Sequence, residues 1–387
     1  MKLLKVLSVL GVCSAVALTL AAQQGCSSDD TSSGGTAGAG AVPPEKPNAP
    51  ATDSKDVRVF AVQNLLFGDT DRTSGAASGE AWKKYGYNLD GKLSTSKSTD
   101  ICTPAEGGSK DAAVDGADGR DNSFGKNIVP IIQQLAGNDF GKSVNDSVQG
   151  GSFTVMFEVT GLKGEKQTNT GLSGQIFAGA KFDGIPENQG KKPTFTKADN
   201  WPVSGELLNG DTIESGSKVK ITDAYIVNGT FVAKADKITI SLVLQGQALN
   251  ISINKAIITM DVAGENAGNG TIAGVIDANE LITGLKSVAG SISKSLCEGT
   301  TFDNIAQQLR QFSDILSDGS NAAGQKCTGI SVGLGFTGKE IGRPTKVTKS
   351  SGTGGDPCKE QPDAGKDSGS SGGQDSGSSG GQDSGTD

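Results

Sequence analysis

The sequence predicts a mainly β domain, either an antiparallel β-sandwich or a jelly-roll-like meander, with a packed helical pair. Three patterns lead to this prediction. Apolar and polar residues alternate in several segments, which is typical of strands with one buried face. Between Lys218 and Val262, short β-branched runs are separated by pairs of turn-forming residues. Two amphipathic helical segments follow, and they would provide the second layer that such a sheet requires.

The first half of the domain is expected to contain two strands and a helix. Val57–Phe67 begins with period-two alternation, which indicates a first or edge strand. An apolar stripe at helical spacing predicts a short helix near residues 129–136, where Pro130 is tolerated in the first turn. In the strand that follows Ser152, four apolar residues share one face: Phe153, Val155, Phe157 and Val159.

The segment from Lys218 to Val262 is interpreted as a meander of about five antiparallel strands. Four pairs of residues mark the expected turns: Asn228-Gly229, Ala235-Asp236, Gln245-Gly246 and Asn254-Lys255. Asn-Gly is the strongest of these signals, because a type I′ turn needs positive φ at both central residues.

The last third is expected to contain the helical pair and a closing strand. Asp277 and Glu280 form a capping box, which marks the start of the first helix. The second helix is predicted over residues 301–316 from a stripe of apolar residues at helical spacing. Strict alternation over Gly329–Thr337 predicts a strand with four inward side chains: Ile330, Val332, Leu334 and Phe336.

The N-terminus is typical of an export signal that ends at a lipidation site. Two lysines precede the apolar run Val6–Ala22, and Gly25-Cys26 follows it. The run is shorter than the roughly 20 apolar residues of a membrane-spanning helix. Residues 1–25 resemble a bacterial lipoprotein signal, although Gln23 stands where an aliphatic residue is usual. The alternative is ordinary signal cleavage, which would leave Cys26 near a soluble N-terminus.

Composition divides the rest of the chain into three parts. Residues 26–53 are rich in Ser, Gly, Ala and Pro and predict a flexible tether. Residues 54–349 are expected to form a single β-rich domain. Residues 350–387 carry short Gly, Ser and Asp repeats and predict a disordered tail. The expected location is the outer membrane or the cell surface, and the alternative is a secreted or periplasmic soluble protein.

The absence of histidine excludes several classes of enzyme. With no His in 387 residues, Ser-His-Asp and Cys-His catalysis and imidazole-based zinc sites are ruled out. The formal net charge is −8, and no concentrated cluster of Lys and Arg is evident, so nucleic acid is not expected as a partner. Residues 136–143 match a phosphate-binding loop, but a helix rather than a strand precedes them, so no nucleotide is expected.

Four cysteines remain in the body of the chain, which indicates two disulfides in an exported protein: Cys102, Cys297, Cys327 and Cys358. Three pairings are possible. The preferred one joins Cys297 to Cys327, because they bracket one helical segment, and leaves Cys102 to bond with Cys358.

One loop has the composition of a calcium site. Asp115, Asp118, Asp121 and Asn122 lie among glycines within residues 111–122. Oxygen ligands on a flexible loop suit Ca²⁺, which takes six to eight of them, although the spacing is not that of an EF-hand. The alternative is a solvated turn-rich loop without metal. No other cofactor is expected.

Three aromatic residues, Trp82, Tyr85 and Tyr87, form a second cluster in a chain poor in aromatics. If they were exposed, they could stack on sugar rings and indicate a glycan partner. The preferred interpretation is that they pin a long loop to the sheet.

Three segments, Trp82–Gly91, Asp115–Asn127 and Val288–Phe302, are similar to those of uncharacterised exported lipoproteins from myxobacteria and related bacteria. The resemblance implies export and a single domain, and it assigns no activity.

The functional prediction is a membrane-tethered, non-catalytic cell-envelope lipoprotein that binds an unknown ligand, such as a glycan or an envelope protein. Two alternatives stay open at this level. One is a secreted, histidine-free hydrolase that uses two carboxylates, as glycosidases do. The other is a carrier of an apolar ligand between β-layers.

Overall fold

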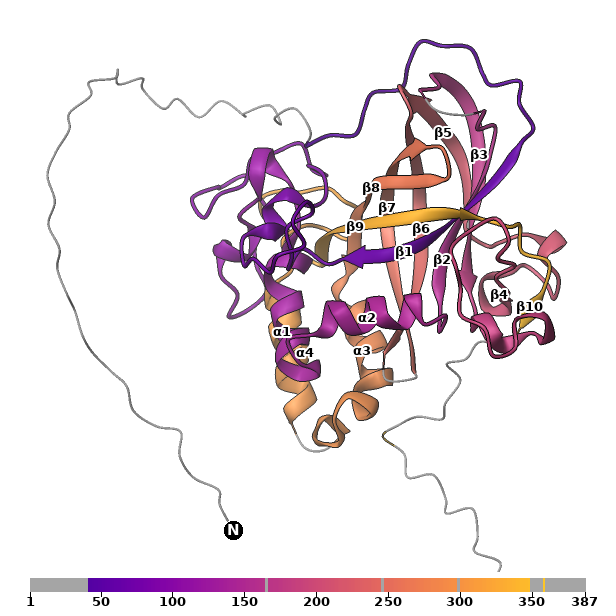
Figure 1. Cartoon of the computed structure of the whole chain (residues 1–387). Coiled ribbons are helices and arrows are strands. Elements are labelled where there is room, and N and C mark those ends of the chain that lie inside the picture. The colour runs from indigo at the N-terminus through magenta and orange to yellow at the C-terminus, as the bar shows by residue number, and fades with distance from the viewer. Residues whose placement is uncertain (1–40, 164–165, 245–246, 298–299, 349–357, 359–387) are drawn as a thin grey trace, which may run out of the picture. The chain divides into compact units, whose positions relative to one another are not determined.

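The computed structural model describes residues 41–163, 166–244, 247–297, 300–348 and 358. Eight antiparallel strands form a ring (Figure 1). Their bounds are β1 (Val57–Leu66), β2 (Thr154–Thr160), β3 (Asn169–Gly179), β5 (Lys220–Val227), β6 (Thr230–Leu244), β7 (Gln247–Ala263), β8 (Asn266–Asp277) and β9 (Gly329–Ile341). Two short strands, β4 (Val203–Ser204) and β10 (Val347–Thr348), extend the sheet beyond β3.

The fold is a closed β-barrel, so the predicted sandwich or jelly roll is wrong. The strand order is β3-β2-β1-β9-β8-β7-β6-β5, and β5 pairs again with β3. The sequence pattern missed β3 because its first half contains Gly171 and Gly174 and lacks regular alternation. Pairing of this strand with both β2 and β5 is what turns an open meander into a ring.

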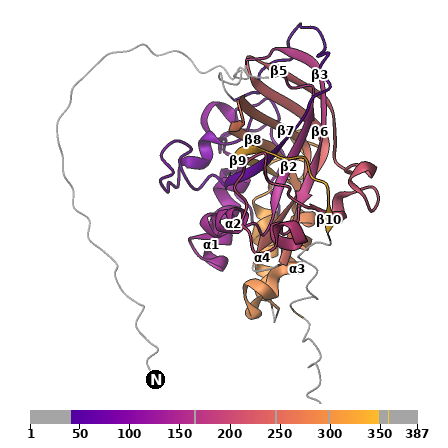
Figure 2. The ribbon, with the colours of Figure 1, turned by 45° about the vertical axis from the view of Figure 1, so that its right-hand side comes forward.

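Four α-helices lie together at one end of the strands (Figure 1 and Figure 2). They are α1 (Val129–Ala136), α2 (Phe140–Gln149), α3 (Ala278–Ile292) and α4 (Thr301–Gln311). Short helical turns occur elsewhere at Ala81–Lys84, Lys110–Ala113, Ala117–Gly119, Phe124–Ile128, Phe182–Gly184, Pro186–Asn188, Gly205–Leu207, Ile213–Ser215 and Lys294–Cys297.

Helix α2 closes one end of the barrel. It contacts β1 and β6, which lie on opposite sides of the ring. The amide of Asn145 accepts a hydrogen bond from the Leu65 N–H (2.7 Å) and donates one to the Leu65 carbonyl (2.9 Å). Phe140 of α2 packs on Phe67, with ring centroids 5.0 Å apart. The buried face of α2 therefore completes the core at this end.

Side chains fill the interior of the barrel. The rings of Phe157 and Phe336 stack with centroids 5.2 Å apart, and Phe60 lies on the strand between them. The inward residues are at most 4% exposed: Phe60, Val62, Leu65, Val155, Phe157, Val159, Ile176, Ile226, Phe231, Ala233, Ile258, Met260, Ile272, Val332, Leu334 and Phe336. Ile330 lies on the same face of β9 and is also buried, so the predicted inward set of the last strand is confirmed.

The predicted meander of about five strands consists of three long ones. The turn at 228–229 is confirmed by the strand bounds, the one predicted at 245–246 lies outside the described residues, and those at 235–236 and 254–255 are wrong. Strands β6 and β7 stay paired through both positions. The buried parity changes there, from Phe231 and Ala233 to Ile238 and Ile240 on β6. The alternation of apolar and polar residues is therefore interrupted because the strand pair bends and its buried face changes there. The chain forms no turn at these positions.

The remaining predicted elements are largely confirmed. The first predicted strand and the helix at 129–136 occur as β1 and α1. Asp277 caps α3 by accepting hydrogen bonds from the N–H groups of Asn279 and Glu280. Helix α4 ends at Gln311 rather than at residue 316, because the Asp314 and Ile315 N–H groups bond to the Gly329 carbonyl on β9.

The outer face of β9 holds a layer of loops formed by residues 67–127. Its outward residues are small, and Gly333 lies directly beneath Tyr85 and Gly86. The Asn122 side chain joins the layers: its carbonyl oxygen accepts from the N–H groups of Gly125 (3.0 Å) and Gly333 (2.9 Å). Glycine at position 333 is what permits this close approach of two backbones.

The segment 41–56 lies along the strands at the end away from the helices (Figure 1). The Tyr225 hydroxyl donates to the Pro44 carbonyl (2.6 Å), and Lys46 pairs with Asp223 (2.6 Å). The Thr52 N–H donates to the Thr170 carbonyl (2.8 Å). Residues 41–53, which were assigned to a flexible tether, therefore pack against the domain.

The disulfides are Cys102–Cys327 and Cys297–Cys358, so the preferred pairing of Cys297 with Cys327 is wrong. Thr103 and Lys326 form a parallel β-bridge, which brings Cys102 beside Cys327 across 225 residues of sequence. The disulfide pairing is therefore decided by the packing of the loop layer against the barrel and not by closeness in the sequence.

We expect Gly333→Ala to destabilise the protein, because the added Cβ would lie 2.5 Å from the Gly86 nitrogen and 2.7 Å from the Tyr85 carbonyl carbon. Overpacking against backbone costs about 1–3 kcal/mol, which urea denaturation would measure. Gly268→Ala is the matched control, since its Cβ would have no heavy atom closer than 4.0 Å. Equal stability of the two variants would contradict this account of the interface.

Candidate functional site

The candidate site is a groove of about 690 Å³ on the outer face of the barrel. It lies at the bend of β6 and β7, beside β5 and the turn at residues 318–319. Five lysines line it: Lys218, Lys220, Lys234, Lys237 and Lys255. We call it the lysine groove.

The bend of the strand pair creates the groove. Lys255 on β7 has φ of 49°, a left-handed conformation that is uncommon for a lysine. The register between β7 and β8 shifts at the same point, between Asn254 and Ile257. A bulge of this kind bends the strand and redirects its side chains. Ala235, Ala256 and Ile257 provide an apolar part of the lining between the lysines.

Two of the five lysines are neutralised by acidic partners. Lys255 pairs with Asp236, with 2.9 Å between the nitrogen and the carboxylate oxygen. Lys237 pairs with Glu280 of α3 at 3.0 Å. Asp318 lies on the rim of the groove. Hydrogen bonds from Ser320 lower the pKa of its carboxyl, and the nearby charge of Lys255 lowers it further.

The other three lysines keep their charge uncompensated. Lys218 donates to the Glu206 carbonyl (2.9 Å), and Lys220 donates to the Gln175 side-chain oxygen (2.7 Å). Lys234 makes no hydrogen bond or ion pair with any residue that the structure describes. Its cross-strand neighbour Asp223 is paired with Lys46 instead. A patch of positive charge therefore faces solvent on an acidic protein.

The sequence did not reveal this site, because its lysines come from three strands and the segment before them. A weak signal was present: Lys218 and Lys220 have the spacing of side chains on one face of a strand. The long-range pairing of β5, β6 and β7 is needed to bring Lys234 and Lys255 beside them.

The loop predicted to bind calcium divides into an exposed and a buried part. Asp118 is exposed, has φ of 59°, and pairs with Arg120 at 3.1 Å. Asn122 is buried in the contacts with Gly125 and Gly333 described above, and it donates to the Trp82 carbonyl (3.2 Å). Asp121 is buried and Asp115 is partly buried, and their carboxyls interact electrostatically with each other. Within the described residues, no group of three or more acidic or cysteine side chains is arranged to hold a metal ion.

The buried carboxyls in this loop layer have strongly raised pKa values. Burial, with contributions from Asp90 and Asp314, raises the pKa of Asp115 to about 7. Burial and the same neighbours hold the pKa of Asp121 well above its ordinary value. Burial raises the pKa of Asp314 to about 7, although hydrogen bonds from the hydroxyl and N–H of Ser331 oppose this shift.

All three aromatic candidates for glycan stacking are buried: Trp82, Tyr85 and Tyr87 are at most 8% exposed. The Tyr87 hydroxyl bonds to the Thr259 hydroxyl (2.7 Å), and the Tyr85 hydroxyl donates to the Thr70 carbonyl (2.7 Å). The guanidinium of Arg72 lies 4.4 Å from the centre of the Tyr85 ring. These contacts favour the interpretation in which the rings pin the loop layer to the barrel.

The predicted signal peptide and the lipidation site Cys26 lie outside the described residues. Within the described part of the chain, none of the helices combines the length and hydrophobicity that a membrane crossing needs.

We expect the stability of the metal-free protein to fall as pH rises from about 5 to 8. The folded state holds the Asp314 proton with a pKa of about 7, whereas the ordinary pKa of an aspartate is about 3.9. Raising the pH therefore favours the unfolded state until the folded carboxyl also ionises, a loss of roughly 1–3 kcal/mol. Thermal melting in EDTA would show this fall, and Asp314→Asn should reduce it. An unchanged slope in the variant would contradict the assignment.

Comparison with protein-family models, with curated proteins and with solved structures finds no match to this chain.

Proposed function

We propose that this protein is a non-catalytic binding module, tethered to the cell envelope, whose lysine groove takes an anionic ligand. The observation behind this proposal is the gathering of five lysines in one groove of a protein that has 43 acidic and 35 basic residues. Three of these lysines lack an acidic partner among the described residues. An anion would therefore be attracted to the groove and repelled by much of the remaining surface.

The ligand class that we favour is an acidic glycan, which is a polymer available to an exported protein. A groove of about 690 Å³ falls within the usual range of ligand sites, roughly 300–1,000 Å³. Carboxylates along a sugar chain could engage Lys234, Lys220 and Lys218 in turn. The apolar lining at Ala235 and Ile257 would contact the faces of the sugar rings.

We propose that the protein is located at the outer membrane or the cell surface and is anchored there by acyl chains on Cys26. The sequence pattern at Gly25-Cys26 supports it. Acyl chains would give a firm anchor, since each buried methylene adds about 0.8 kcal/mol. A secreted or periplasmic soluble form is the alternative address.

The hydrolase alternative receives less support from the geometry. Glycosidases place two carboxylates about 5–9.5 Å apart across a cleft. Asp121 and Asp314 are instead 3% and 6% exposed, so they do not face an open cleft. Ser331, which lies in a Gly-x-Ser-x-Gly match, is fully buried on β9 and bonded to Asp314.

The packing of the barrel interior gives little support to the alternative of an apolar-ligand carrier. The stacked rings of Phe157 and Phe336 and the other inward side chains occupy the space between the strands. A ligand that entered would have to displace packed side chains.

We expect Lys234→Glu to weaken binding of a fluorescent oligogalacturonate about fivefold to thirtyfold, measured by anisotropy. A lost attraction and a new repulsion at a surface charge are each worth about 0.5–1 kcal/mol. Lys192→Glu, an exposed lysine outside the groove, is the matched control and should bind like the unmodified protein. Equal losses in both variants, or equal binding of neutral dextran, would contradict a specific groove.

We expect Cys26→Ser to abolish labelling of the protein with radioactive palmitate in cells and to move it from the membrane to the soluble fraction. The thiol is the predicted acylation point, so a hydroxyl in its place cannot carry a thioether-linked lipid. Export of the variant should persist, because the rest of the signal is intact. If labelling survives the substitution, the lipid anchor at Cys26 is refuted.

A further inference from the structure

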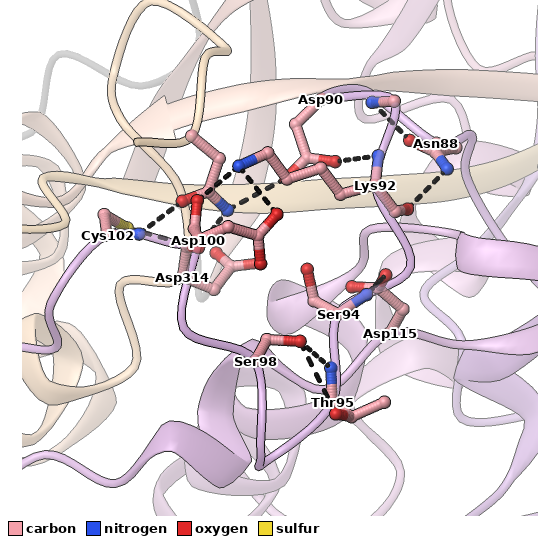
Figure 3. Close-up of polar contacts among 12 residues, drawn as sticks. Asn88, Asp90, Lys92, Ser94, Thr95, Ser98, Asp100, Cys102, Asp115 and Asp314 are labelled. Carbon is pink, nitrogen blue, oxygen red and sulfur yellow. Dashed lines mark hydrogen bonds and ion pairs between the residues drawn. The ribbon is translucent and has the colours of Figure 1, made fainter. Parts of the chain in front are cut away.

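A second site is suggested by four carboxylates that gather between the loop layer and β9. Asp90, Asp115, Asp121 and Asp314 interact electrostatically with one another. Asp121 and Asp314 are 3% and 6% exposed. Figure 3 shows Asp90, Asp115 and Asp314 converging on this region from separate parts of the chain.

The backbone holds three of these carboxylates in place. The Ser94 N–H donates to Asp115 (2.5 Å), and the Leu89 N–H donates to Asp121 (2.6 Å). The Lys92 N–H donates to Asp90 (2.8 Å). These fixed donors prevent the carboxylates from turning away from one another.

Asp115 and Asp121 flank a short closed loop. The Gly116 N–H donates to the Arg120 carbonyl (2.8 Å), which brings the two ends of this loop together. The carboxyls of Asp115 and Asp121 interact electrostatically with each other. Because two ionised carboxylates repel, a cation between them would be stabilised.

The nearest basic side chains form no ion pair with the cluster. The charge of Lys126 acts on Asp314 and Asp115, but its hydrogen bonds go to the carbonyls of Asp111 and Val114, and it lies 5.1 Å from the Trp82 ring centre. Lys92 pairs with Asp100 at 3.1 Å. The described residues therefore provide no ion pair that neutralises Asp115 and Asp121.

An independent observation points to a ligand at the same place. The Ser94 side chain is 5% exposed, and its hydroxyl oxygen has no hydrogen-bond partner among the described residues. In Figure 3 this oxygen points from its loop toward the carboxylates. A buried hydroxyl without a partner is unfavourable, and a bound cation would satisfy it.

We propose that Asp115 and Asp121 bind a calcium ion between their carboxylates, with the Ser94 hydroxyl as a further ligand. Asp90 and Asp314 add negative charge around the ion. The donors are all hard oxygens, which Ca²⁺ prefers. Water would have to complete the six to eight oxygen ligands of the ion, because the described part holds no group of three or more acidic or cysteine side chains arranged for a metal.

This site differs from the one expected from loop composition. Asp118 is excluded because it is exposed and paired with Arg120. Asn122 is excluded because it is committed to Gly125, Gly333 and Trp82. Ser94 joins the proposed set of calcium ligands, although it lies about twenty residues before the loop.

The test uses the full exported chain after removal of metal with EDTA. Calcium is titrated at pH 7.5 by calorimetry, and the melting temperature is recorded with and without Ca²⁺. We expect saturable binding and a rise of at least about 3 °C at a hundredfold excess over Kd. Asp121→Asn should abolish both effects, and Ser94→Ala should weaken binding severalfold. Asp118→Asn is the matched control and should leave binding unchanged.

Two results would overturn the proposal, and both can be read without a folded site variant. One is that 10 mM Ca²⁺ produces neither heat nor stabilisation in the unmodified protein, while the melting temperature is higher at pH 5 than at pH 7.5. This result would mean that Asp115 and Asp121 share a proton and bind no cation. The other is loss of calcium binding in Asp118→Asn, which would return the site to the exposed loop. Neither result bears on anion binding in the lysine groove.

Discussion

Pairing of β3 with β5 closes the sheet, and the rest of the structure depends on that closure. An open sheet would leave these two strands with exposed N–H and carbonyl groups. Closure also defines an inside, in which Phe157 and Phe336 stack and the other inward side chains pack. Helix α2 can then seal one end by bridging β1 and β6. The core of the protein is therefore a consequence of one long-range strand pair.

Strand β9 connects this core to the layer of loops outside it. Its inward residues are large and apolar, whereas Ser331, Gly333 and Gly335 face outward. Because Gly333 and Gly335 have no side chains, Tyr85 and Gly86 can lie directly on the strand. The same docking buries the carboxylates of Asp121 and Asp314 far from water. The proposed calcium site thus arises from the way in which the loops are attached, because burial leaves these charges without solvent.

The lysine groove illustrates a different use of the barrel surface. The bend in β6 and β7 exchanges the buried face of both strands and opens a hollow on the outside. Ion pairs neutralise Lys237 and Lys255 beside this bend. Among the described residues, Lys218, Lys220 and Lys234 have no acidic partner, and exposed lysines of this kind contribute little to stability. The proposed anionic ligand would give these three charges a role in binding.

The sequence by itself determined the local elements of this protein. Period-two alternation located β1, β2 and β9, and the apolar stripe and the capping box located α1 and α3, because these patterns reflect the geometry of single strands and helices. It also excluded histidine chemistry outright. The choice of barrel over sandwich, the pairing of Cys102 with Cys327 and the assembly of the lysine groove were decided only by tertiary structure. Each depends on contacts between residues far apart in the chain. The buried Ser94 was invisible for the same reason, since nothing in its neighbouring residues marks it as a ligand.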